Sequence, residues 1–399
     1  MTGSGAPRQS LWRIPQIRAV FAISFAGLAS FSITLAALPA WAAQIGHSEQ
    51  VVGTITGVML GVTVLTQLGT ARLLYRFSTR SLLAAGSLLL GMPTPLYLLL
   101  PQLESLYALS AVRGVGFAIV TVVGALAIPR AAPPERRGEA IGIFGLSAAI
   151  PMMVGISGGA ALVLGGSFRV VAILGALPVL ALVALPYVSA EDMGQAPRAT
   201  VSLPRAASRL LYPAGLLLAI TAAGGGLVTL LPLQRPSGAV AALALLVFGA
   251  VGMVARWQVG AVLDRAGNRL VLPVLVAAGV LGLVVVALTL AATASWLLMV
   301  GAGLLGLAYG GLQTVTLEMS FHRLPASDAP TASAIWNAAF DGGTAVGAAV
   351  LGFVGATALG GSGALAIGAA AIAVIGVLGL VASGRSAQHT GPEVERTHR

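Results

Sequence analysis

The sequence predicts an all-α polytopic membrane protein with twelve transmembrane helices in two pseudo-symmetric six-helix bundles. Three observations carry this prediction: the composition, a series of long apolar segments, and the position of the arginines between them. Hydrophobic residues make up 57% of the 399-residue chain and charged residues only 9%, whereas soluble domains carry about 25% charged residues. So few charges cannot cover a surface in water, but lipid tails require no polar partners.

Twelve apolar segments are long enough to cross a bilayer, since a span needs about 20 apolar residues. Those of the first half lie near residues 17–43, 50–74, 82–100, 105–128, 139–164 and 168–188. Those of the second half lie near 211–233, 238–262, 270–291, 295–318, 330–357 and 362–383. We therefore expect a first bundle over 1–188, a cytoplasmic linker over 189–210, a second bundle over 211–383 and a polar cytoplasmic tail over 384–399.

The arginines test this order of spans independently. If both termini are cytoplasmic, 19 of the 22 basic residues fall on the cytoplasmic side. They are Arg8, Arg13, Arg18, Arg72, Arg76, Arg80, Arg130, Arg136, Arg137, Arg198, Arg205, Arg209, Arg256, Arg265, Arg269, Arg323, Arg385, Arg396 and Arg399. Only Arg169 and Arg235 fall in outer loops, and Arg113 lies inside a span. This asymmetry predicts a protein of the cell (inner or plasma) membrane with both termini cytoplasmic.

Several other classes of function find no support in the sequence. The net charge of +10 is spread between the spans rather than gathered on one face, so no nucleic-acid partner is expected. The chain has no Cys and its four His are scattered, so no metal site is predicted. The G-x-G-x-x-G pattern at Gly301–Gly306 lies in an apolar span, and there is no P-loop, so no cofactor is expected.

Two loops of the predicted halves share a pattern of charges. The loop after the second span contains Ala71-Arg-Leu-Leu-Tyr75-Arg-Phe-Ser-Thr-Arg80, and the loop after the eighth contains Gly260-Ala-Val-Leu-Asp264-Arg-Ala-Gly-Asn-Arg269. Aligned, the loops share Arg76 with Arg265 and Arg80 with Arg269. A repeated half is a common plan for transporters.

At these residues the chain resembles the major facilitator superfamily, in particular its twelve-helix drug–proton antiporter branch. The loop signature of that family is approximately G-x-L-x-D-R-x-G-x-R. The second copy matches it at Gly260, Asp264, Arg265, Gly267 and Arg269. The first copy departs from it, with Tyr75 in place of the acid. Arg113-Gly-Val-Gly116 in the fourth span and Gly155-Ile-Ser-Gly-Gly159 in the fifth span are similar, more loosely, to two further signatures of the branch.

The resemblance implies a gating latch on the cytoplasmic side that holds the outward-open state. Its residues here are Asp264, Arg265, Arg269, Gly260, Gly267, Arg76 and Arg80. Because Tyr75 replaces the acid, the first-half latch is expected to differ from the second. The alternative is that these arginines only set the orientation in the membrane.

Two ionisable residues lie well inside predicted spans, where charges are costly and usually functional. They are Arg113 and Asp341, about 12 Å and about 16 Å from the starts of their spans by helical rise. A lone carboxyl group in a low dielectric can load and release a proton near neutral pH, so Asp341 is the candidate for proton coupling. Arg113 is assigned to the same site, either to tune Asp341 or to attract an anionic substrate. Structural roles remain open for both.

Neutral polar residues on spans that line the central cavity in family members are candidates for substrate contact. They are Ser30, Thr34, Tyr309, Gln313, Trp336 and Asn337. Glycine rows at Gly53, Gly57 and Gly61, and at Gly343 and Gly347, are expected to pack the second span against the eleventh across the two halves.

The expected function is secondary active transport, with proton-coupled efflux of a small organic compound by alternating access. The alternative within transport is proton-coupled or facilitated uptake. The expected partners are a small-molecule substrate, protons and membrane lipid, and the chain is expected to be a monomer. A membrane-embedded enzyme is the alternative of another class. It finds little support, because no predicted span holds a His and no two acids lie close on one helix face.

Overall fold

The computed structural model describes residues 10–47, 49–190, 200–234, 238–290, 295–355 and 357–388, and these ranges contain helices but no strand. Eleven helices in them are long and apolar enough to cross a membrane. Parts of the predicted linker (191–199) and tail (389–399) lie outside the described residues. The all-helical fold predicted from the composition is confirmed.

The first half begins with a short 3₁₀ turn, η1 (Leu11–Arg13), before its α-helices. These are α1 (Pro15–Gln44), α2 (Glu49–Leu74), α3 (Thr79–Gly91), α4 (Pro93–Leu96), α5 (Leu103–Ala131), α6 (Arg137–Leu164), α7 (Phe168–Gly175) and α8 (Leu177–Leu180). The 3₁₀ turns η2 (Pro134–Arg136) and η3 (Ala181–Tyr187) complete this half.

The second half repeats the plan, with its third span undivided. These are α9 (Leu203–Gln234), α10 (Gly238–Ala266), α11 (Asn268–Thr289), α12 (Ser295–Arg323), α13 (Ala329–Val346), α14 (Gly352–Gly355) and α15 (Gly360–Gln388). The 3₁₀ turn η5 (Ala326–Asp328) precedes α13, and the π-helical segment η6 (Gly347–Leu351) separates it from α14.

Three details differ from the predicted spans. The third span is divided into α3 and α4 at Met92, because Pro93 and Pro95 remove backbone donors. The helix α9 begins at Leu203, inside the predicted linker. The helix α12 continues past residue 318 to Arg323 and therefore includes His322.

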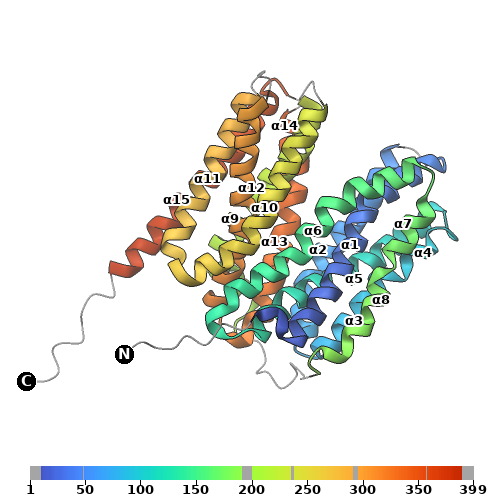
Figure 1. Ribbon diagram of the computed structural model, residues 1–399, viewed down its shortest axis with the longest axis horizontal. Coiled ribbons are helices and arrows are strands. Elements are labelled where there is room, and N and C mark those ends of the chain that lie inside the picture. Colours follow the sequence, from blue (N-terminus) through green and yellow to red (C-terminus); the bar gives the residue numbers. More distant parts are fainter. Residues whose placement is uncertain are drawn as a thin grey trace, which may run out of the picture.

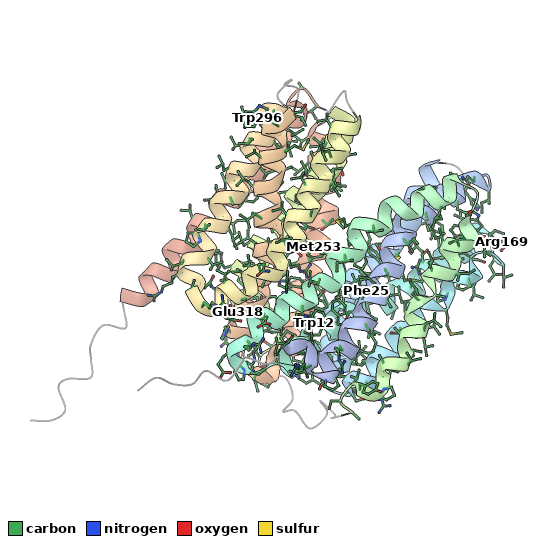
Figure 2. The ribbon with its side chains drawn as sticks, viewed as in Figure 1. Trp12, Phe25, Arg169, Met253, Trp296 and Glu318 are labelled. Atoms are coloured by element: carbon green, nitrogen blue, oxygen red, sulfur yellow. The ribbon has the colours of Figure 1, made fainter. Side chains whose placement is uncertain are left out.

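The two halves form separate bundles that meet at one end and diverge toward the other (Figure 1). Contacts between them join α6 with α10, and α13 with α2 and α5. The cross-half contacts involve residues 67–75 of the first half with 327–341 of the second, and 138–145 with 256–264. We call this the joined end. Trp296 lies at the separated end of the second bundle (Figure 2).

Glycines allow the close approach of α6 and α10 at the joined end. A Cβ built on Gly138 would overlap the carbonyl oxygen of Gly260, and a Cβ on Gly260 would overlap that of Gly138. One turn further along α6, a Cβ on Gly142 would collide with the backbone of Trp257. Only a residue without a side chain therefore permits this backbone contact.

The predicted packing of the second span against the eleventh is present, as α2 against α13, but the glycine rows do not form it in this conformation. A Cβ added to Gly57 or Gly61 of α2 would meet no atom within 4 Å. Gly343 of α13 and Gly347 of η6 instead pack against α9 of their own half, where Thr221, Leu218 and Ala222 lie against them. The physical reason is that α2 and α13 diverge beyond the joined end, so their small-residue faces do not meet.

Candidate functional site

Asp341 lies at the contact between the two halves. It belongs to α13 and is partly buried, and its Oδ2 accepts a hydrogen bond from Nε2 of Gln67 in α2 at 2.5 Å. Gln67 is fully buried, and its Oε1 has no hydrogen-bond partner in the described part of the chain. The carboxyl group of Asp341 thus contributes directly to the contact between α2 and α13.

Arg256 of α10 forms a second polar cluster at the same junction. Its guanidinium group donates to Oε1 of Gln313 in α12 and lies 5.9 Å from the ring centres of Phe144 and Trp336. Phe144 belongs to α6, so this cluster also spans the two halves. The sequence predicted Arg256 in a cytoplasmic segment, and this is corrected: it lies within α10 and is only 6% exposed. Its guanidinium group is covered by Gln313, Phe144 and Trp336.

Tyr309 of α12 lies four residues before Gln313, the partner of Arg256, and is partly buried. Its ring packs against Phe248 at a centroid distance of 5.0 Å and against Gly224. The predicted pair Tyr309 and Gln313 therefore shares a neighbourhood with Arg256.

Trp336 and Asn337 are buried rather than exposed on a cavity wall. The indole nitrogen of Trp336 donates to Thr316 at 3.1 Å. Asn337 donates to the carbonyl of Ser333 at 2.9 Å, and the Ser333 hydroxyl donates to the carbonyl of Val122 in the first half at 2.7 Å. In this conformation Trp336 joins α13 to α12, and Asn337 bonds to its own helix.

Arg113, Ser30 and Thr34 form one cluster inside the first bundle. Arg113 is fully buried and donates to Thr34 Oγ1 at 2.7 Å, to Ser30 Oγ at 3.3 Å and to the carbonyl of Leu90 at 3.2 Å. Tyr97 lies 5.8 Å away, beneath the guanidinium. In this conformation Ser30 and Thr34 are buried against the guanidinium group, and Arg113 contacts neither Asp341 nor any other described carboxylate. Nη1 of Arg113 has no hydrogen-bond partner among the described residues.

The second copy of the loop motif connects the halves through Asp264. Its Oδ1 accepts from the backbone nitrogen of Gly138 at 3.2 Å, and its Oδ2 accepts from that of Glu139 at 3.1 Å. These are free amide groups of the first turn of α6, where a negative charge is favourable. Asp264 therefore caps a helix of the other half.

The first copy makes a contact of different chemistry at the corresponding place. The hydroxyl of Tyr75 donates to the carbonyl of Ser327, in η5 before α13, at 2.7 Å. Burial raises the pKa of Tyr75 above its usual value, so the hydroxyl stays protonated and can donate at neutral pH. Arg130 of α5 also donates to a carbonyl of η5, that of Ala326, at 3.3 Å. Tyr75, in place of the acid of the motif, thus keeps a hydrogen bond between the two halves but contributes no charge to it.

The arginines of the two loops do not take part in these contacts. The side chains of Arg76, Arg80, Arg265 and Arg269 form no hydrogen bond or ion pair with a described residue. Gly267 has a φ of +75°, a conformation that favours glycine, and it precedes α11. The loop arginines therefore remain available to lipid headgroups or solvent.

The family model described as "Major Facilitator Superfamily" matches residues 20–294. The chain belongs to the major facilitator superfamily. The match does not distinguish the drug–proton antiporter branch. A search of curated proteins found no significant match.

Solved structures of the superfamily share the fold. One is a major facilitator superfamily transporter, FucP, in the outward conformation, with 12% identity and a TM-score of 0.71 over 92% of this chain and 98% of that one. Another is the E. coli fucose:proton symporter FucP, with 13% identity and a TM-score of 0.71 over 90% of this chain and 97% of that one. This superfamily member is therefore a multi-pass membrane transporter and not an enzyme.

Within this superfamily fold, the two loop contacts predict different effects of substitution. Asp264→Asn removes the charge at the first turn of α6, and capping interactions of this kind contribute about 1 kcal/mol. We expect Asp264→Asn to lower transport several-fold with near-normal expression. Tyr75→Phe removes one neutral hydrogen bond and should have the smaller effect. Initial transport rates, normalised to the amount of protein in the membrane, compare the two variants. Equal rates for Asp264→Asn and wild type would mean that the charges of this loop only set the orientation of the protein in the membrane.

Proposed function

We propose that the chain is a secondary active transporter that couples movement of a small organic solute to protons, with Asp341 as the proton site. The observation that carries this proposal is the hydrogen bond between Asp341 and Gln67 at the junction of the two halves. A change of charge there acts directly on the contact that alternating access must break and remake.

The unpaired oxygen of Gln67 supports a protonated Asp341 in this conformation. A buried acceptor without a donor costs about 1–3 kcal/mol. A carboxylic acid beside a primary amide supplies the missing donor, whereas a carboxylate offers none. Loss of the proton therefore removes a donor and adds a charge between α2 and α13, which destabilises the closed junction.

We propose further that the joined end faces the cytoplasm and that the conformation is outward-open. The arginine asymmetry supports this orientation, since the predicted cytoplasmic segments still hold 18 of the 22 basic residues once the buried Arg256 is left out. Asp264 and Tyr75 then act as latches on the cytoplasmic side.

The orientation is testable with reporter fusions. A reporter joined after Ser189 and another at the C-terminus are both expected to report a cytoplasmic location. A fusion after Arg169, in a predicted outer loop, serves as the opposite control. An external C-terminus would contradict both the orientation and the even number of spans.

Proton coupling is testable in cells that do or do not produce the protein. We expect the accumulation of at least one compound in a panel of small organic solutes to differ several-fold between the two, and a protonophore to abolish the difference. A difference that survives the protonophore would mean facilitated diffusion. Expression of the Asp341→Asn variant at the same level controls for indirect effects on the membrane.

The direction of transport has two candidates. The loop and helix signatures resemble drug–proton antiporters, which favours efflux. FucP, which has the same fold, is described as a fucose:proton symporter, which favours proton-coupled uptake. Inverted and right-side-out vesicles with an imposed pH gradient separate them, because antiport and symport move the solute in opposite directions for the same gradient.

A further inference from the structure

The helices that receive the two latches begin in the same way. The 3₁₀ turn before α6 follows Pro133 (φ −55°, ψ 146°), and the 3₁₀ turn before α13 follows Pro325 (φ −55°, ψ 151°). Each helix then begins at the fourth residue after its proline. Counted from these prolines, Pro330 of α13 occupies the place that Gly138 occupies in α6.

This equivalence gives a reason for the missing acid of the first latch. Asp264 accepts hydrogen bonds from two backbone N–H groups of α6, one of them that of Gly138. Proline has no backbone N–H, so the corresponding donor is missing at Pro330. Tyr75 brings a hydroxyl donor to this place and uses it on the carbonyl oxygen of Ser327, three residues before the proline.

The length of the Tyr75 side chain also fits this contact. At the second latch the backbones of α6 and α10 touch, and a Cβ on Gly260 would overlap the carbonyl oxygen of Gly138. At the first latch the equivalent residues are Ala71 and Pro330, and their side chains exclude such a close approach of two backbones. A tyrosine reaches farther than an aspartate and can therefore bridge the wider gap.

We propose that Tyr75 and Pro330 are a matched pair of positioning residues that makes the latch between α2 and α13 neutral, and weaker than the charged latch between α6 and α10. Hydrogen bonds from backbone N–H groups to a carboxylate are about twice as strong as neutral ones. The neutral latch joins the ends of the same two helices as the hydrogen bond between Gln67 and Asp341. This contact can therefore open without separating a charge from a helix N-terminus. The inference goes beyond the proposed function and depends neither on the solute nor on a proton at Asp341.

The charged residues around the first latch do not replace its missing acid. The carboxylate of Asp328 accepts hydrogen bonds from the backbone of Thr200 and Val201, before α9, and does not cap α13. Arg130 of α5 is exposed and lies outside the loop motif, and it donates to the carbonyl oxygen of Ala326. Both loop-side contacts with this turn are therefore made by side-chain donors on backbone carbonyl groups.

The reporter for the test is the variant Ser333→Cys, in purified protein in nanodiscs, where a maleimide reaches both faces. Ser333 is fully buried and donates to the carbonyl oxygen of Val122 across the two halves. A thiol at this position reacts only when the contact between the halves opens. The rate of labelling therefore measures how often the joined end opens, whatever the orientation in the membrane.

The test asks whether the effect of Pro330→Ala depends on residue 75. Pro330→Ala supplies the missing N–H, and Tyr75→Glu supplies a carboxylate with a longer reach than that of Asp. Tyr75→Glu with Pro330→Ala is expected to label about fivefold more slowly than Tyr75→Glu alone, the usual contribution of an N-terminal cap. With Tyr75, and with Tyr75→Phe as the matched control, no carboxylate can use the new N–H, so Pro330→Ala should have a clearly smaller effect. The contribution of Arg130 is common to all these variants and cancels.

An equal effect of Pro330→Ala with all three residues at position 75 would overturn the pairing, because the proline would then act only through its own helix. Gly61→Cys repeats the comparison without a change at Ser333, since its added Cβ meets no atom within 4 Å. This thiol lies beyond the joined end, so its labelling should become faster where labelling of Ser333→Cys becomes slower. Neither reporter requires proton coupling, so a failure of the proposed function would leave this result unaffected.

Discussion

Asp341→Asn should abolish proton-driven accumulation while substrate binding and exchange persist. Asn keeps the size of Asp and can still accept the hydrogen bond from Gln67, but it cannot release a proton. A pH difference of about one unit supplies about 1.4 kcal/mol per proton, which sustains about tenfold accumulation of solute. The variant should show no accumulation above equilibration, as measured in vesicles with an imposed pH gradient.

Gln67→Leu is the informative companion variant. It removes the partner of Asp341 without removing the titratable group, so coupling should survive with an altered dependence on pH. Asp328→Asn controls for the loss of another buried acid of the same half, since the Asp328 side chain accepts hydrogen bonds from the backbone of Thr200 and Val201 and does not contact Gln67. Transport by Asp341→Asn against a gradient with the pH dependence of wild type would refute Asp341 as the proton site.

The membrane fold could be predicted because its determinants are local. An apolar run of about 20 residues satisfies its own backbone hydrogen bonds as a helix, whatever its neighbours are. The break at Met92 could be anticipated in principle from Pro93 and Pro95, but apolar length alone conceals it. The conformation in which Gly57 and Gly61 meet no neighbour could not be predicted, because one sequence must serve every conformation of the transport cycle.

The candidate site was predicted less completely because its contacts are long-range. Asp341 was recognisable as an isolated acid deep in a span. Its partner Gln67 lies 274 residues away in sequence and carries no signal of its own. The role of Arg256 in this contact was not recognised, because an arginine near the end of a span normally marks the cytoplasmic side of the membrane. Its own neighbours offered a clue: Gly252 and Gly260, each four residues away, make one side of α10 smooth enough for close packing.

Arg113 shows that depth in the membrane does not by itself indicate a transport role. Depth correctly predicted that its charge would be buried and partnered. Its role depends on the face of α5 that it occupies. The guanidinium group points into the first bundle and donates hydrogen bonds to α1 and α3. Residues that change their surroundings during transport must lie between the bundles, as Asp341 and Arg256 do.

Gly260→Val is expected to shift the resting conformation away from the outward-open state. A side chain at Gly260 would overlap the carbonyl of Gly138 in α6, and such overpacking costs about 1–3 kcal/mol. Only the conformation with the joined end closed contains this contact, so the substitution opens that end and closes the other. Transport should fall strongly, because the cycle can no longer close the cytoplasmic side.

Cysteine labelling can follow this shift, since the chain contains no native Cys. Gly61→Cys places a thiol where no atom lies within 4 Å of the new Cβ, so an impermeant maleimide added outside should react with it rapidly. In the Gly260→Val background the reaction should slow several-fold as α2 and α13 close over it. Gly215→Val makes the same change in α9 where the added Cβ meets nothing within 4 Å, and it should leave labelling unchanged. Unchanged labelling and transport in Gly260→Val would show that the contact of α6 with α10 is no gate.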